Sequence, residues 1–410
     1  MKTNLFLLLV VAGLEPAAAQ KYYTYVGNLS PDSALIAWGT TDGVNTIGRS
    51  SASHGEATVR INGKEFTSRQ NWAVVGGLKP DTEYLYQISL GGKPIGQGSI
   101  RTWPEKSTRL VFFVIGDYGT GNRAQNDVAR SMWTEFEKRN ASGNPVRFVL
   151  TVGDNIYGDL TTIFFGLRHT GASDSDWADK FFEPYAQLLT HIPFYPTLGN
   201  HDGNETESRG DLAAYLDNFF FPSDKPSRYN TFKYADLAEF FGLDSTTNSE
   251  SGSAQPAFLE SGQQFQWMRQ AIPASKLPWR IPYYHHPMFN AGPRHIASYR
   301  DLSPWLRLFQ NAGVKVVFNG HEHNFQMSQA NERSGGIRFV TSGAGGELRL
   351  GAVQHRMNQQ NMAGWAAQNH FLVVEIEGKT MRLTPVGPRE IVVRDPSGGV
   401  VPLPITVTLP

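Results

Sequence analysis

Residues 110–119 read Leu-Val-Phe-Phe-Val-Ile-Gly-Asp-Tyr-Gly, an apolar run of strand length that ends in a polar turn. Residues 146–154, Val-Arg-Phe-Val-Leu-Thr-Val-Gly-Asp, have the same arrangement, with Gly-Asp again closing the run. Short apolar runs between turn residues are typical of strands that are buried on both faces. The two segments therefore predict the central strands of a layered domain.

The chain after residue 109 continues this pattern. Further apolar runs of strand length, each ending in a turn, lie at Ile192 to Leu198, Trp279 to Tyr284 and Val314 to Phe318. Asn126 to Arg139 and Trp177 to Thr190 instead carry apolar residues at helical spacing. Strands that alternate with helices predict an α/β core. Later runs at 337–341, 370–376 and 380–386 are expected to close a second sheet.

Residues 20–102 have a different character. Short alternating runs lie at Tyr23 to Val26, Ser33 to Trp38, Ala57 to Ile61 and Tyr84 to Ile88. Asp and Gly clusters separate them, as expected for hairpins of an antiparallel β-sandwich. The stretch Leu78-Lys79-Pro80-Asp81-Thr82-Glu83-Tyr84-Leu85-Tyr86 resembles the signature of fibronectin type III-like domains. We therefore expect such a domain over residues 20–102, a linker over 103–108, and the α/β domain over 109–410.

The N-terminus has the pattern of a secretory signal peptide. Met1-Lys2-Thr3-Asn4 precedes the apolar run Leu5 to Leu14, and Ala17-Ala18-Ala19 precedes Gln20. A charged start, a short apolar stretch and a small-residue cleavage site predict export, with residues 1–19 removed and no membrane span afterwards. An uncleaved anchor is the alternative. The expected location is secreted or periplasmic.

Composition excludes several classes of function. The chain has 37 Lys plus Arg and 37 Asp plus Glu, so it carries no overall positive charge that would bind a nucleic acid duplex. It has no Cys, which excludes disulfides, thiolate-bound metals and a cysteine nucleophile. An exported protein without Cys favours a bacterial source. Any metal must be held by His, carboxylate, amide or phenolate groups.

Polar clusters follow five of the predicted strands. They are Gly116-Asp117-Tyr118-Gly119, Gly153-Asp154-Asn155-Ile156-Tyr157, Gly199-Asn200-His201-Asp202, His285-His286-Pro287 and Gly320-His321-Glu322-His323. Ligands of α/β sheets gather outside the carboxyl ends of the strands, so these clusters are expected to converge. Each cluster taken singly is also an ordinary turn. Together they supply oxygen and imidazole donors in about the number that two adjacent metal ions need.

In this order the five clusters resemble the motif blocks of the purple acid phosphatases, within the calcineurin-like metallophosphoesterases. The resemblance covers roughly residues 109 to 355. It implies a two-sheet α/β sandwich, and the β-sandwich in front matches the extra domain of larger members.

The resemblance also implies the ligands of two metal ions. Asp117, Tyr157 and His323 would hold Fe3+, and Asp154 would bridge the two ions. Asn200, His285 and His321 would hold a divalent ion, Zn2+, Mn2+ or Fe2+. His286 is the alternative to its neighbour His285, which the family's spacing to Pro287 selects.

The resemblance implies roles for three further residues. His201 stands where the family places a residue that contacts phosphate, and His295 matches the position of the proposed general acid. Arg294 stands where plant members often carry a second His, and its guanidinium is expected to bind a phosphate oxygen.

The function implied is a secreted acid phosphatase that acts on small phosphate monoesters, a phosphoric monoester hydrolase. In-line attack of a metal-bound hydroxide would release phosphate. A phosphodiesterase or nucleotidase at the same metals is the nearest alternative. A noncatalytic surface-binding protein is the alternative from another class, and such a relic is expected to have lost ligands.

Overall fold

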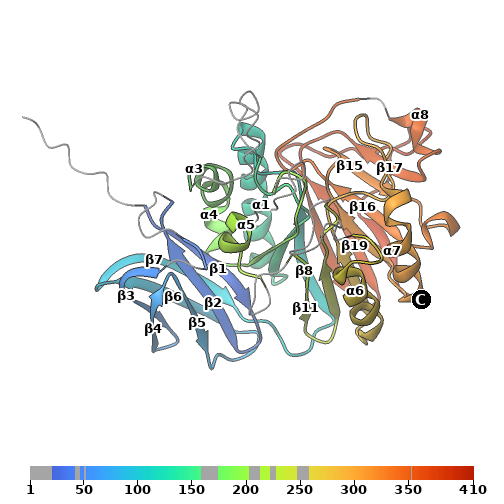
Figure 1. The fold of residues 1–410 in the computed structure, drawn as a ribbon. Helices are drawn as coiled ribbons and strands as arrows, with labels where there is room; N and C mark the ends of the chain where they lie inside the picture. The colour runs from blue at the N-terminus through green and yellow to red at the C-terminus, as the bar shows by residue number, and fades with distance from the viewer. Residues whose placement is uncertain are drawn as a thin grey trace, which may run out of the picture.

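The computed structural model describes residues 21–41, 47–49, 52–157, 174–202, 213–221, 228–246, 258–351 and 353–410. Figure 1 shows the N-terminal strands at one end of the molecule and the late strands at the other. The predicted signal peptide lies outside the described residues. Within the described part of the chain, no helix has the length and hydropathy needed to cross a bilayer.

The N-terminal strands form two antiparallel sheets. One has the order β1-β2-β5, from β1 (Tyr23–Leu29), β2 (Ser33–Gly39) and β5 (Trp72–Gly76). The other has the order β4-β3-β6-β7, from β3 (Ala52–Ile61), β4 (Lys64–Gln70), β6 (Glu83–Leu90) and β7 (Lys93–Arg101). Alternate residues of both sheets, such as Ile36, Trp38, Val59 and Ile88, are fully buried. The predicted all-β N-terminal region is confirmed.

Two larger sheets follow. The first has the order β10-β9-β8-β18-β19-β20, from β8 (Arg109–Ile115), β9 (Val146–Thr151), β10 (Phe194–Pro196), β18 (Phe371–Glu377), β19 (Thr380–Val386) and β20 (Ile405–Thr408). The second has the order β11-β12-β13-β14-β16-β15-β17, from β11 (Asn230–Tyr234), β12 (Ala238–Gly242), β13 (Trp279–Tyr283), β14 (Val316–Asn319), β15 (Phe325–Ser328), β16 (Arg338–Ser342) and β17 (Met362–Ala366). Strands β8, β9 and β10 are parallel, as are β12, β13, β14 and β16.

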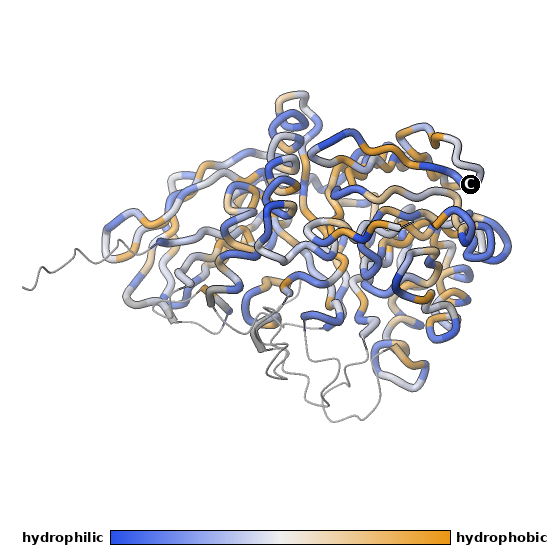
Figure 2. Tube along the Cα trace, turned by 90° about the horizontal axis from the view of Figure 1, so that it is seen from above, coloured by the Kyte–Doolittle hydropathy of each residue, from blue (hydrophilic) through white to orange (hydrophobic). Residues whose placement is uncertain are grey.

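The two faces of β8 show why the central runs are apolar throughout. Leu110, Phe112 and Val114 belong to the core that also contains Phe240 and Phe318 of the second sheet. The residues between them, from Val111 to Ile115, face the core built with α1 (Arg123–Ala141). A third core joins the second sheet to α6 (Gln263–Ala274) and α7 (Tyr299–Asn311). The α/β prediction is therefore confirmed as two facing sheets with helices outside, and Figure 2 shows apolar segments, in orange, running through the middle of the molecule.

Two segments differ in detail from their predictions. The single helix expected at residues 177–190 is divided into α3 (Asp174–Trp177), a π-helical turn (Ala178–Phe182) and α4 (Glu183–Leu189). The late strands do not all join one sheet, since β16 pairs with β14 whereas β18 pairs with β8. The remaining elements are short: α5 (Ala213–Asn218), a 3-10 turn (Glu332–Ser334) and α8 (Gln354–Met357).

The N-terminal sheets pack directly on the larger domain. Trp103, at the start of the predicted linker, is 4% exposed and lies against Phe148, Tyr195 and Tyr234. Asp81 forms ion pairs with Arg101 and with Arg147 of β9. The hydroxyl of Tyr86 donates to the carbonyl of Thr190 at 3.0 Å. These contacts join the two regions over several elements.

Candidate metal centre

Tight turns at the carboxyl ends of the strands aim the candidate ligands at one place. Asp117, Asp154 and His321, which follow β8, β9 and β14, have φ angles of 55°, 51° and 71°. Residues other than glycine rarely adopt this left-handed backbone region. Backbone strain of this kind is often found at functional sites. Gly199 allows the turns to meet, because a Cβ there would lie 2.1 Å from the backbone nitrogen of Asp154.

One group of donors gathers around the hydroxyl of Tyr157. Ligand atoms of Asp117, Asp154 and His323 all lie within 4.8 Å of one another. The Tyr157 oxygen is 3.4 Å from Asp117 Oδ1, 3.0 Å from Asp154 Oδ2 and 3.2 Å from His323 Nε2. Two carboxylates, an imidazole and a phenol therefore point into one small space.

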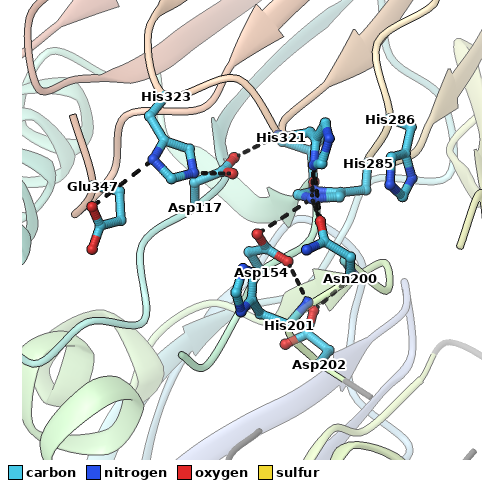
Figure 3. Close-up of polar contacts among 12 residues, drawn as sticks. Asp117, Asp154, Asn200, His201, Asp202, His285, His286, His321, His323 and Glu347 are labelled. Atoms are coloured by element: carbon cyan, nitrogen blue, oxygen red, sulfur yellow. Dashed lines mark hydrogen bonds and ion pairs between the residues drawn. The ribbon is translucent and has the colours of Figure 1, made fainter. Parts of the chain in front are cut away.

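A second group of donors lies beside the first. The Asn200 Oδ1 atom is 3.0 Å from His285 Nε2 and 2.8 Å from His321 Nδ1. His285 Nε2 is also 3.4 Å from Asp154 Oδ2. Asp154 thus contacts both groups, and Figure 3 shows it between Asp117 and the second group.

The centre combines buried negative charge with hard donor atoms. Asp117 and Asp154 are 0% and 1% exposed, and among the described residues their ion-pair partners are the histidines His323 and His285. Burial raises the pKa of Asp117, which His323 offsets only in part. Burial and the charges of Asp154 and Asp117 raise the pKa of Tyr157 well above its usual value. This donor set fits two cations, since oxygen and imidazole ligands suit Fe, Zn and Mn ions.

The adjacent histidines 285 and 286 have different surroundings. His285 Nδ1 is 2.8 Å from the carbonyl of Val152, which leaves Nε2 facing Asn200 and Asp154. Burial alone would lower the pKa of His285, but the charge of Asp154 outweighs this effect and raises the pKa to about 10. His286 instead places Nδ1 3.0 Å from the hydroxyl of Ser245, and burial lowers its pKa to about 3. The geometry favours His285 as the side chain that faces the centre.

Asp202 holds the turns that carry the candidate ligands. Its Oδ1 accepts from the amides of Asn155 and Ile156 at 2.8 and 3.1 Å. Its Oδ2 accepts from the amide of Gly199 at 2.8 Å and from Asn155 Nδ2 at 2.7 Å. Burial, together with the charge of Asp154, raises the pKa of Asp202 to about 7. The only signal for this role in the sequence is the last residue of Gly-Asn-His-Asp.

His201 and His295 contact different candidate ligands. His201 has its ring 4.6 Å from that of Tyr157, and its amide donates to Asp154 Oδ1 at 2.8 Å. His295 has its ring 3.9 Å from that of His321, in a stacked arrangement. Burial and the neighbouring charge of Arg349 lower the pKa of His295 to about 4. Both histidines therefore border the donor groups.

The two arginines near His295 are placed differently. Arg294 is exposed, although its charge acts on His295. Arg349, which belongs to none of the five motifs, places Nη1 3.0 Å from His295 Nε2. Glu322 supports the same loop, because its buried Oε2 accepts from the amide of His295 at 3.0 Å. No local pattern signals Arg349, which lies 54 residues from its contact.

The chain is similar to known proteins in sequence and in fold. A family model described as calcineurin-like phosphoesterase matches residues 107–325, more than half of the 410-residue chain. Purple acid phosphatase 3 of Arabidopsis thaliana is 26% identical over 303 residues, covering 68% of this chain and 75% of that protein. An uncharacterized protein of Mycobacterium tuberculosis is 23% identical over 327 residues, covering 74% of this chain and 60% of that one.

Solved structures show the same fold. A purple acid phosphatase from yellow lupin (Lupinus luteus) seeds has a TM-score of 0.69 at 14% identity, and the match covers 95% of this chain and 74% of that one. PhoD has a TM-score of 0.65 at 12% identity, with coverage of 95% and 94%. Both similarities extend over the N-terminal sheets as well as the larger domain, since they cover nearly the whole chain.

Proposed function

Because the chain belongs to the calcineurin-like phosphoesterase family, we propose that it hydrolyses phosphate monoesters at a centre of two metal ions. The observation that carries the proposal is the position of Asp154. Its carboxylate contacts Tyr157 on one side and His285 on the other, so a single side chain joins two groups of donors. A buried carboxylate shared in this way suits a bridging ligand of a two-metal site.

Each of the two donor groups would bind one metal ion. Asp117, Tyr157 and His323 would hold one ion, and Asn200, His285 and His321 the other. The phenolate of Tyr157 favours a trivalent ion, so this site would take Fe3+, and the amide and imidazole site would take Zn2+, Mn2+ or Fe2+. Two ions bound here would activate a water molecule and polarise the phosphoryl oxygens.

The surrounding side chains would orient the substrate and move protons. His201, whose ring lies 4.6 Å from that of Tyr157, would contact a phosphoryl oxygen, and the exposed Arg294 would bind another phosphate oxygen. The Nδ1 of His295 lies 3.1 Å from the carbonyl oxygen of His321, which fixes the proton on that atom. In the doubly protonated ring, Nε2 would be the atom that gives a proton to the departing alcohol, and the pKa of about 4 places this form at acid pH.

The replacement His295→Ala tests this assignment. Nitrophenolate departs without a proton, whereas an alkoxide needs one. We expect turnover of an alkyl phosphate to fall by about 10²- to 10⁴-fold, and turnover of p-nitrophenyl phosphate to fall much less. An equal loss on both substrates would remove His295 from the general-acid role. Comparing p-nitrophenyl phosphate with bis(p-nitrophenyl) phosphate separates a monoesterase from the diesterase alternative.

The N-terminal pattern adds a location to the proposal. Residues 1–19 would direct export and be removed, which leaves the enzyme secreted or periplasmic. The residues 20–102 would form the fibronectin type III-like domain of the mature protein. N-terminal sequencing of the protein recovered outside the cytoplasm should begin near Gln20, and an intact Met1 there would contradict cleavage.

A further inference from the structure

Residues 346–349, which lie between β16 and α8, are hydrogen-bonded to residues of the candidate metal centre. The amides of Gly346 and Glu347 donate to the carbonyl of Asp117 at 3.0 and 3.1 Å, and the amide of Arg349 donates to the carbonyl of His323 at 2.9 Å. The backbone of this segment is therefore fixed to two residues that carry candidate ligands. This fixes the Cα of Arg349 relative to the centre.

The guanidinium of Arg349 lies at the edge of the second donor group. Its Nη1 is 3.0 Å from Nε2 of His295, whose ring stacks on that of His321 at 3.9 Å. The Arg349 side chain is 17% exposed, so it is mostly buried but still reaches solvent. A substrate that approaches His321 from the His295 side would meet this positive charge.

The contacts of the Arg349 side chain within the protein are weak ones for a guanidinium. His295 is a ring acceptor, and Glu322 Oε1 is 3.9 Å away, beyond hydrogen-bond distance. That oxygen of Glu322 is buried and has no hydrogen-bond partner among the described residues. A guanidinium has five N–H donors, and the side-chain contacts that Arg349 makes to the described residues all involve Nη1. Within the described part of the chain its other nitrogens make no side-chain contact, so they could bind an anion.

We propose that Arg349 determines substrate specificity by binding a nonbridging oxygen of a phosphate monoester dianion. The proposal rests on the proposed phosphoesterase function and names the residue that sets its preference for monoesters. A monoester carries one more ionisable oxygen than a diester, and the attraction of a nearby cation grows with that charge. Guanidinium groups also match phosphate oxygens with paired donors. A shift of the guanidinium from His295 onto the phosphate would also uncover Nε2 of that histidine.

The test uses Arg349→Gln and Arg349→Lys in the metal-loaded full chain. With p-nitrophenyl phosphate, kcat/KM of the Gln variant should fall by about 10- to 100-fold, the effect of losing a charged hydrogen bond. With bis(p-nitrophenyl) phosphate the fall should stay within about threefold. The Lys variant keeps the charge and should retain part of the preference for the monoester. Inorganic phosphate, measured by calorimetry, should bind the Gln variant about tenfold more weakly.

Arg307→Gln is the matched control, because it removes a guanidinium that is 65% exposed on α7. It should leave both rates and phosphate affinity unchanged. An equal loss on both esters in Arg349→Gln, at unchanged metal content, would overturn the proposal. It would also be overturned if Arg294→Gln, and not Arg349→Gln, lost the monoester preference.

If the protein is not a phosphoesterase, these measurements give a result that differs from failure of the Arg349 proposal alone. A wild-type protein that binds two metals but hydrolyses neither ester would defeat the proposed function. In that case phosphate affinity still tests Arg349, because equal binding by the wild type and Arg349→Gln would overturn its role as an anion-binding residue.

Discussion

Under the proposed function, Tyr157 would distinguish this centre from a two-metal site that has no phenolate ligand. Its hydroxyl lies within 3.4 Å of three candidate ligands, and burial with the charges of Asp154 and Asp117 raises its pKa well above the usual value. Loss of the phenol proton therefore requires a strongly charged cation. A phenolate bound to ferric iron absorbs visible light through charge transfer.

Tyr157→Phe should bleach the iron-loaded protein without unfolding it. The other six candidate ligands would still hold both ions, so activity should survive in part. A visible spectrum and an iron determination on the same samples check this. Stoichiometric ferric iron with no visible band in the wild type would contradict a phenolate ligand.

At the level of residues, the candidate site residues that belong to short motifs could be predicted from the sequence. Asp117, Asp154 and His321 each follow an apolar strand directly, so strand ends and turn residues locate them. The metal-binding roles themselves remain predictions. Arg349 and Glu322 could not be assigned a contact with the His295 loop, because packing between distant loops and not local pattern brings them together.

At the level of elements, the turn containing Gly199 is where the strand ends meet. A Cβ at Gly199 would lie 2.1 Å from the amide nitrogen of Asp154 and 2.2 Å from its Oδ1 atom. Gly199→Ala must therefore displace the shared carboxylate. We expect metal affinity to fall by about 10- to 100-fold, measured by competition with a chelator.

Gly143→Ala provides the matched comparison. Gly143 has φ +74°, a Cβ added there would meet nothing within 4 Å, and the residue lies between α1 and β9. This substitution should cost about 1 kcal/mol of stability, from backbone strain alone. Its metal affinity should equal that of the wild type, and the same loss of metal in both variants would refute the steric argument.

The central strands were predictable as elements because their pattern is local. Residues 110–115 are apolar at every position, since one face of β8 packs on the second sheet and the other on α1. The partners of the late strands were not predictable. Strands β16 and β18 are both short and largely buried. Long-range pairing alone decides that β16 pairs with β14 and β18 with β8.

At the scale of the whole molecule, Trp103 connects the N-terminal sheets to the larger core. It is 4% exposed and surrounded by aromatic rings. Trp103→Ala should lower the free energy of unfolding by about 3–5 kcal/mol, measured by denaturant titration. Leu85→Ala, at a side chain that is 78% exposed, should change it little. Equal effects of the two variants would contradict a structural role for Trp103.

The metal-free protein should respond to pH through His285. Although burial opposes it, Asp154 raises the folded-state pKa of His285 to about 10, above its usual value of 6.5. The protonated form thus contributes stability that is complete below pH 6.5 and is lost as the pH rises toward 10. Between about pH 7 and the folded-state pKa the free energy of unfolding should decline, and His285→Asn should flatten the curve. An unchanged slope in that variant would exclude His285 as the cause.

The proposed function depends on two metal ions held by one shared carboxylate. The direct measurement is the hydrolysis of p-nitrophenyl phosphate while metal is returned stepwise to the depleted full chain, with bound metal determined at each step. We predict that activity appears with the second equivalent per chain and reaches a plateau at two. Full activity in the depleted protein, or a plateau at one bound ion, would contradict the two-metal centre.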